Sequence, residues 1–176
     1  MRYIETKISG VVIIEPELLE DERGFFSRTW DEQEAGKHGL KLATAQCNIS
    51  FNAHTGTLRG MHYQEKPHEE AKLVRCTGGA LLDVALDIRR DSPTYRQWVS
   101  AELNAENRRA LYIPEGVAHG FQTLSDNTEI FYQMGEYFHP ESARGIRFDD
   151  PAFAIEWPDA KRIMSEKDMS YADWVV

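Results

Sequence analysis

The stretch Gly78-Gly-Ala-Leu-Leu-Asp-Val-Ala-Leu-Asp-Ile88 decides the fold class, because it contains the clearest strand signal of the chain. Leu82 and Val84 share one face of an extended backbone, whereas Asp83 and Asp87 share the opposite face. This period of two is typical of a strand with one buried and one solvated face. The two leading glycines tolerate positive φ, so they predict a tight hairpin turn back to the preceding residues.

The same signal recurs outward from this stretch, as short runs of β-branched and aromatic residues separated by Gly, Pro, Asn and Asp. Such a series predicts a β-sandwich or barrel. The predicted strands cover residues 11–14, 25–30, 42–50, 58–63, 72–77, 80–88, 97–103, 109–113, 120–124 and 129–137. About ten antiparallel strands favour an all-β jelly roll, a double-stranded β-sandwich that forms one domain over residues 1–176.

Few helices are expected. Residues 31–38 predict one short helix, which Gly39 would end. The last 27 residues, from Asp150, mix prolines and tryptophans with scattered polar residues. We expect this segment to form short C-terminal helices that pack over the sheet.

The charge balance excludes two classes of partner. The 176 residues include 20 Lys and Arg against 29 Asp and Glu, so the formal net charge is −9 at pH 7. Without a run of basic residues, such a surface offers no electrostatic footprint for a nucleic-acid backbone and no polybasic segment for an anionic membrane. We therefore expect neither nucleic acid nor membrane as a partner.

The two cysteines and the N-terminal residues predict a reducing, cytoplasmic setting. Cys47 and Cys76 have neither a metal-binding spacing nor the density of a disulfide scaffold, and no stretch reaches the ~18 apolar residues of a membrane-spanning helix. The first ten residues lack the apolar core of a signal peptide.

Two of the six histidines lie in settings that suit a binding site. His62 follows Gly60 on a predicted strand, where the alternation places Leu58, Gly60 and His62 on one face. A small residue beside an imidazole leaves room for a ligand. His119 follows a Pro-x-Gly turn that begins at Pro114 and can direct a side chain into a barrel mouth. For either histidine alone, a hydrogen-bonded core position is the alternative.

Positive side chains surround the first of these histidines. Arg59 precedes His62, Lys72 and Arg75 lie on the next predicted strand, and Arg23 follows a turn. In an acidic protein, cations around a candidate base predict an anionic ligand, and Arg binds phosphate through bidentate hydrogen bonds. The alternative is that each cation extends into solvent.

The two histidine segments resemble the sequence boxes of the cupin superfamily, which supply a metal site in many members. Gly56 and His62 match the first box, and Pro114, Gly116 and His119 match the second. Gln64 replaces the second histidine of the first box. Glu69 lies at the spacing of the carboxylate ligand, so a metal-dependent oxygenase or isomerase with His62, Glu69 and His119 as ligands is one alternative function.

A longer series of motifs is similar to the dTDP-4-dehydrorhamnose 3,5-epimerase family over about the whole chain. The matching segments include Asp21-Glu-Arg-Gly-Phe-Phe26, Gln46-Cys-Asn-Ile-Ser50, Leu58-Arg-Gly-Met-His-Tyr-Gln64, Lys72-Leu-Val-Arg75, Ile113-Pro-Glu-Gly-Val-Ala-His-Gly-Phe121 and Ser165-Glu-Lys-Asp168. The resemblance implies a cupin-like jelly-roll homodimer that uses no cofactor and no metal. Its implied substrate is a nucleoside-diphosphate 4-keto-6-deoxy sugar of deoxysugar and O-antigen biosynthesis, with dTDP as the expected nucleotide.

The resemblance also implies roles for individual residues. His62 would be the catalytic base and Asp168 its carboxylate partner, although the Ser165-x-x-Asp168 spacing alone favours a helix-capping box. Tyr132 would be the proton donor and Lys72 the cation that stabilises the enolate. The implied substrate-binding residues are Arg23, Gln46, Asn48, Arg59, His119 and Lys167.

Three positions depart from the family pattern. Arg28 stands where Glu is usual, Ala143 where an acidic residue is common, and Phe138 where a second Tyr is frequent. We count Arg28 and Phe138 among the substrate-binding residues. The reversed charge of Arg28 leaves the nucleotide open, CDP included, and the lost hydroxyl at Phe138 leaves open whether C3, C5 or both are inverted. A catalytically silent sugar-nucleotide binding module is a further alternative.

Overall fold

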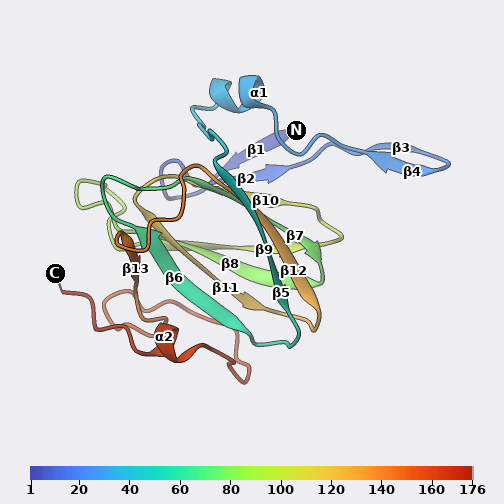
Figure 1. The fold of residues 1–176 in the computed structure, drawn as a ribbon. Helices are drawn as coiled ribbons and strands as arrows, with labels where there is room; N and C mark the ends of the chain where they lie inside the picture. Colours follow the sequence, from blue (N-terminus) through green and yellow to red (C-terminus); the bar gives the residue numbers. More distant parts are fainter. Residues whose placement is uncertain (176) are drawn as a thin grey trace.

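Two antiparallel sheets face each other in the computed structural model, which describes residues 1–175 (Figure 1). The six-stranded sheet consists, in spatial order, of β1 (Arg2–Glu5), β2 (Val12–Glu15), β10 (Ala110–Ile113), β7 (Lys72–Gly78), β12 (Thr128–Met134) and β5 (Gln46–Asn52). The five-stranded sheet consists of β13 (Ala143–Gly145), β6 (Leu58–Gln64), β11 (Val117–Thr123), β8 (Ala80–Asp87) and β9 (Trp98–Asn104). The predicted all-β jelly roll is confirmed. The hairpin predicted at Gly78-Gly79 is wrong, because β7 and β8 belong to different sheets and do not pair with each other.

Most of the predicted strands form with shifted ends, and three short strands were not predicted. The prediction over 42–50 began too early, because β5 starts at Gln46, and the one over 25–30 was too long, because β4 covers only Gly24–Phe26. The missed strands are β1, β3 (Leu19–Asp21) and β13. Their three or four residues are too few to show a period, and β3 and β4 form an isolated exposed hairpin that projects from the body (Figure 1).

The short helices have identifiable ends. α1 (Glu32–Lys37) begins after Asp31, whose side chain accepts a hydrogen bond from the Glu34 N–H at 3.0 Å, and Gly39 with φ of 74° follows it, as predicted. Residues 150–175 contain one helix, α2 (Glu166–Met169), rather than the several helices predicted. No helix among residues 1–175 is long and apolar enough to cross a membrane.

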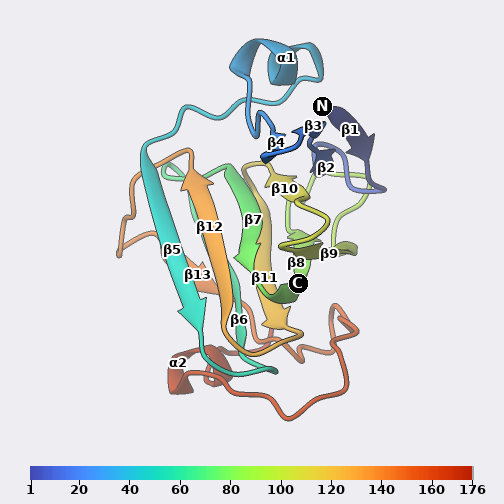
Figure 2. The ribbon, with the colours of Figure 1, turned by 90° about the vertical axis from the view of Figure 1, so that its right-hand side faces the viewer.

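Three clusters of apolar side chains hold together the layers that Figures 1 and 2 show. The first lies between the two sheets and includes Val74 and Leu81. The second lies on the outer face of the six-stranded sheet, where α1 covers it through Ala35. The third lies on the outer face of the five-stranded sheet, under C-terminal residues such as Phe153. Both sheets are therefore buried on two faces over part of their area.

The alternation along β8 was interpreted wrongly, because its aspartates do not face solvent. Asp83 and Asp87 are fully buried, and Val84 and Leu86, on the other face, are also buried. The C-terminal segment covers the apolar face, so the aspartate face is the one that points between the sheets. Buried carboxylates require partners, and His119 and Arg89 provide them.

A bulge in β6 changes which of its side chains share a face. His62 pairs with His119 of β11, but Arg59, three residues away, pairs with Phe121, only two residues from His119. The extra residue on β6 brings Arg59 and His62 to the same cavity. Gly60 is required there, because its φ is 123° and a Cβ would lie 2.5 Å from the Gly120 Cα. The predicted sharing of one face by Leu58, Gly60 and His62 is therefore wrong.

Candidate active site

A cavity of about 590 Å³ opens between the two sheets at the end where β5 and β12 face β6 and β11. It brings together most of the side chains that the sequence singled out. The predicted residues that line it are Gln46, Asn48, Arg59, His62, Lys72, His119, Tyr132, Phe138 and Lys167. Strand alternation explains the polar lining of β5, whose even-numbered residues face the cavity.

His62 forms a hydrogen-bonded pair with Asp168 at one wall of the cavity. The distance from His62 Nε2 to Asp168 Oδ1 is 2.7 Å, and the imidazole is 46% exposed whereas the carboxylate is 7% exposed. Burial alone would raise the pKa of Asp168. The hydrogen bond and charge of His62 and the N–H of Gly60 lower it by more, so the pKa of Asp168 lies below its ordinary value. The carboxylate is thus ionised and holds Nε2, which leaves Nδ1 free.

The helix cap and the pair with His62 both exist. Ser165 Oγ accepts a hydrogen bond from the Asp168 N–H at 3.1 Å, which confirms the capping role of Ser165. The Asp168 side chain also contacts His62 and the Gly60 N–H on β6. One residue therefore closes the first turn of α2 through its backbone and orients an imidazole through its side chain.

His119 forms a second pair with Asp83, deeper in the sheet. His119 Nε2 lies 2.6 Å from Asp83 Oδ1, and the exposed fractions are 12% for the imidazole and zero for the carboxylate. Both residues belong to neighbouring strands, β11 and β8. Among residues 1–175, Asp83 Oδ2 has no hydrogen-bond partner, so His119 is the partner that compensates the burial of this carboxylate.

Lys72 and Tyr132 enter the cavity from the six-stranded sheet, opposite His62. The buried Lys72 Nζ lies 2.8 Å from Glu70 Oε1 and donates to the His62 carbonyl oxygen at 3.3 Å. Burial raises the pKa of Tyr132; nearby Arg59 opposes the shift and Glu70 adds to it. The phenol therefore keeps its proton at neutral pH, and the Glu70 carboxylate holds the Lys72 ammonium in place.

Three of the predicted cations lie elsewhere in the single chain. Arg23 is exposed in the β3–β4 hairpin and pairs with Asp21, and Arg28 pairs with Asp31 before α1. Neither lines the cavity. Arg75 lies on the face of β7 opposite to Lys72, because the two are three residues apart, and it donates to the Thr29 carbonyl. The prediction that Arg75 belongs to the cationic cluster is wrong.

The structure does not assemble the alternative metal site. His62 and His119 are each paired with an aspartate, and Glu69 is not among the residues that line the cavity. Among residues 1–175, the one group of three or more potential metal ligands lies elsewhere, at His68, His139 and Glu141. No donor set in the cavity thus corresponds to the ligands predicted from the cupin boxes.

Sequence reasoning missed several residues at the site, and three of them contact predicted site residues. Glu70 and Tyr171 line the cavity, and Asp83 supports His119. The Tyr171 ring packs where a Gly145 Cβ would be and lies edge-on to His62, with ring centroids 6.3 Å apart. Asp83 was visible as an acidic residue in an apolar strand, but its orientation depends on the C-terminal cover. Nothing in the local sequence marks Glu70 or Tyr171.

Fold and site together define a cupin-like jelly-roll protein whose cavity holds a histidine–aspartate pair facing a tyrosine and a lysine. Comparison with known proteins gives the family. Residues 5–175 match the family model described as dTDP-4-dehydrorhamnose 3,5-epimerase, and the chain belongs to this family. It is an isomerase of the racemase and epimerase class.

Individual relatives cover nearly the whole chain. The dTDP-4-dehydrorhamnose 3,5-epimerase of Shigella flexneri is 43% identical over 171 residues, which is 97% of this chain and 94% of the relative. The crystal structure of the Bacillus anthracis enzyme of that name, with TDP and PPi bound, superposes with a TM-score of 0.94 at 37% identity, covering 98% and 99% of the chains. A 3'-monoepimerase from Streptomyces bikiniensis, in complex with dTDP-quinovose, gives a TM-score of 0.89 at 30% identity, covering 97% and 86%.

Proposed function

We propose that this chain epimerises C3, C5 or both of a nucleoside-diphosphate 4-keto-6-deoxyhexose by removing and returning a proton beside the ketone. The observation that carries the proposal is the His62–Asp168 pair, whose imidazole is half exposed in the cavity while Asp168 holds Nε2 at 2.7 Å. Family members bound to TDP and to dTDP-quinovose support a dTDP-linked substrate.

The base in this proposal is His62. With Nε2–H donated to Asp168, the lone pair of Nδ1 is available to accept the proton from the carbon next to the ketone. The negative Asp168 then stabilises the imidazolium that forms. General acid–base catalysis of this kind contributes about 10² to 10⁴ in rate.

Lys72 and Tyr132 complete the reaction from the opposite sheet. The ammonium of Lys72, fixed by Glu70, stabilises the enolate oxygen, and a preorganised donor of this kind contributes about 10² to 10³ in rate. Tyr132 returns a proton to the face opposite the base, which inverts the carbon. Glu70 acts through Lys72 and is a positioning residue. No metal or cofactor takes part in these steps.

The remaining cavity residues bind the substrate. Arg59 and Lys167 are suited to the diphosphate, because both are cations at the same cavity as His62. His119, held by Asp83, offers its other ring nitrogen to the sugar. Gln46 accepts a hydrogen bond from the Phe138 N–H at 2.7 Å and so connects the strand β5 to the loop that carries Phe138, and Asn48 lines the cavity beside it.

A homodimer explains why two predicted substrate residues lie outside the cavity. The strand β5 lies at the edge of its sheet, and its outer face exposes the apolar side chains of Ile49 and Phe51. Its inner face carries the polar side chains, which is the reverse of the usual strand pattern. Phe26 is likewise exposed on the projecting β3–β4 hairpin. We infer that a second copy covers these residues, and that the hairpin and the residues after it bring Arg23 and Arg28 to the partner's cavity.

We also propose that the chain forms a single domain and that it is located in the cytoplasm. Residues 1–176 form one cupin-like epimerase domain, which is supported by a cavity that takes residues from β5 to α2. A cytoplasmic location is supported by two free cysteines, Cys47 and Cys76.

Inversion of one carbon alone is the second candidate. Phe138 lines the cavity without the hydroxyl that a Tyr would offer, and Ala143 lines it without a carboxylate. A structural neighbour is a 3'-monoepimerase. Loss of polar contacts to the sugar ring favours a site that orients one carbon, rather than both, beside His62.

Solvent exchange tests both candidates. The chain is incubated in D2O with 4-keto-6-deoxy sugars on dTDP, CDP and GDP, and NMR follows deuterium at C3 and C5. We expect deuterium with the dTDP sugar and none with His62→Ala, whereas His54→Ala, an exposed histidine elsewhere, exchanges like the wild type. Label at one carbon only identifies a monoepimerase. Undiminished exchange in His62→Ala would show that the base is another residue, and no exchange with any sugar would favour a binding module.

A further inference from the structure

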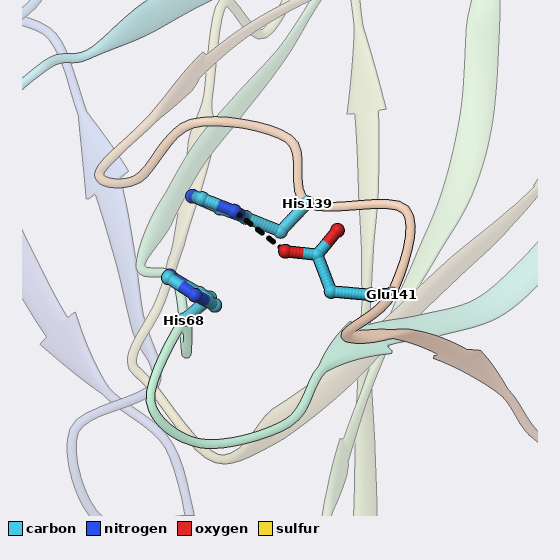
Figure 3. Close-up of side chains that lie close together, drawn as sticks. All are labelled: His68, His139 and Glu141. Carbon is cyan, nitrogen blue, oxygen red and sulfur yellow. Dashed lines mark hydrogen bonds and ion pairs between the residues drawn. The ribbon is translucent and has the colours of Figure 1, made fainter.

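Two histidines and a glutamate come together (Figure 3), and none of the three is among the residues that line the catalytic cavity. His68 belongs to the β6–β7 connection, whereas His139 and Glu141 belong to the β12–β13 connection. The two imidazoles are stacked, with ring centroids 3.4 Å apart and an interplanar angle of 12°. One ligand atom from each of the three residues lies within 4.8 Å of the others.

The two connections that carry these side chains are held together by one buried amide. Gln64 is 4% exposed, and its Nε2 donates to the carbonyl oxygens of His68 and Tyr137, at 3.0 Å each. Its Oε1 accepts a hydrogen bond from the His139 N–H at 2.6 Å. These hydrogen bonds of Gln64 fix the separation between the backbones of residues 68 and 139. The side chains of His68 and His139 therefore meet.

The donors are of the kind that bind zinc. Imidazole nitrogen and carboxylate oxygen are the usual non-thiolate ligands of Zn²⁺, and three protein ligands plus water satisfy its tetrahedral preference. His139 Nδ1 already lies 3.1 Å from Glu141 Oε1. The Glu141 side chain is exposed, so its carboxylate is accessible to a cation.

A second carboxylate occupies the position of an outer partner. Glu136 Oε1 lies 3.9 Å from His139 Nε2, the ring nitrogen that faces away from Glu141. Histidines that bind a metal commonly present their other ring N–H to a carboxylate, which fixes the tautomer and increases the basicity of the ligating nitrogen. At 3.9 Å Glu136 is too far for a hydrogen bond to Nε2, but Nδ1 faces Glu141 at 3.1 Å, so Nδ1 is the nitrogen of His139 offered to the metal.

We propose that His68, His139 and Glu141 form a binding site for a divalent transition metal ion, with Zn²⁺ as its ligand. Parallel imidazoles direct their lone pairs side by side, so one ring turns about its Cβ–Cγ bond when the ion binds. Water completes the coordination, since Glu141 is 67% exposed. The site is independent of the epimerase chemistry, and its three ligands are not residues that line the cavity.

Binding at this position links two connections at the cavity rim. Glu136 and Phe138, from the connection that carries His139, line the cavity. A bound ion would therefore restrain the segment that presents Phe138, in addition to the restraint by Gln64. The ion is a structural clamp and takes no part in proton transfer.

Zinc binding is tested on tag-free chain treated with a chelator. Zn²⁺ is titrated in competition with a colorimetric chelator, and Co²⁺ is added as a spectroscopic probe. We expect one Zn²⁺ per chain and visible Co²⁺ bands of tetrahedral intensity. His139→Asn and His68→Asn should each weaken Zn²⁺ binding at least about a hundredfold, since loss of outer partners alone costs 10 to 100-fold.

Two controls separate this site from the catalytic cavity. His54→Asn and His62→Asn change histidines outside the cluster and should leave Zn²⁺ affinity and the Co²⁺ bands unchanged. The proposal is overturned if fewer than about half of the chains bind Zn²⁺, if His139→Asn binds like the wild type, or if His62→Asn abolishes binding. None of these results depends on whether the chain epimerises a sugar.

Discussion

The two histidine–aspartate pairs have nearly the same length but are built in different ways. His119 and Asp83 lie on neighbouring strands of one sheet, with the imidazole 12% exposed. His62 takes its partner Asp168 from α2, 106 residues further along the chain, and its imidazole is 46% exposed. One pair is part of the sheet, whereas the other exists only when the C-terminal segment docks on the sheet.

This difference separates a rigid site from one that can be adjusted. Both residues of a pair inside the sheet lie on strands that are hydrogen-bonded to each other. Such a pair is rigid and can hold a substrate group at a fixed distance. A pair across a docked segment leaves one face of the imidazole open to the cavity, as a base requires. We therefore assign proton transfer to His62–Asp168 and substrate positioning to His119–Asp83.

The largest expected effect comes from neutralising the two carboxylates one at a time. Asp168→Asn removes the charge that stabilises the His62 imidazolium, so kcat should fall about a hundredfold to a thousandfold with little change in KM. Asp83→Asn should raise KM about tenfold and affect kcat less, because His119 binds rather than transfers a proton. Steady-state kinetics on the dTDP sugar measures both.

A stability measurement distinguishes these effects from misfolding. Asp83→Asn should also lower the free energy of unfolding by about 1 to 3 kcal/mol, since its buried partner loses a charged hydrogen bond. Asp168→Asn should change stability less because the cap by Ser165 uses its backbone. Equal kcat losses in the two variants would contradict the division of roles.

Asp87 provides a third buried carboxylate, on the same face of β8 as Asp83 but paired with no histidine. Burial raises its pKa, yet hydrogen bonds from Arg89, Ser92 and Thr94 outweigh this and lower it to about 2. A folded-state pKa below the ordinary 3.8 stabilises the folded chain above about pH 4, and that stabilisation disappears as the pH falls toward 2. It amounts to about 2 kcal/mol.

The corresponding variant is Asp87→Asn. At pH 7 it should lose about 2 kcal/mol of unfolding free energy, and its stability should fall less steeply than that of the wild type between pH 4 and pH 2. Denaturant unfolding at a series of pH values measures this. The kcat at neutral pH should stay at the wild-type value, unlike in Asp168→Asn. A parallel loss of kcat would mean that the positions of Asp83 and Asp87 are coupled along β8.

The two pairs were not equally accessible from the sequence. Period-two alternation located β8 and the strand that carries His62, and family resemblance supplied Asp168. The orientation of Asp83 could not be predicted, because the alternation gives two faces but not the segment that covers one of them. The position of Arg59 beside His62 depends on a one-residue bulge in β6, which strand periodicity does not contain.

The positive side chains predicted around His62 also could not be placed from the local sequence alone. Lys72 and Arg75 are close in sequence, but their offset of three places them on opposite faces of β7. Glu70, which holds Lys72, lies before the strand and carries no motif. Contacts across the cavity arise from the packing of two sheets, so they follow from tertiary structure alone.

The smallest expected effect concerns the docking of α2 itself. Ser165→Ala removes the acceptor for the Asp168 N–H, and the loss of an N-cap costs about 1 kcal/mol. Because α2 carries the partner of His62, we expect faster amide hydrogen exchange in residues 165–170 and a kcat lowered by a few fold, with KM unchanged. Ser165→Asn, which keeps a capping acceptor, should restore both properties. If Ser165→Ala loosens α2 while kcat stays at the wild-type value, Asp168 is held by the sheet through His62 and Gly60, and the contrast between a docked pair and a built-in pair does not hold.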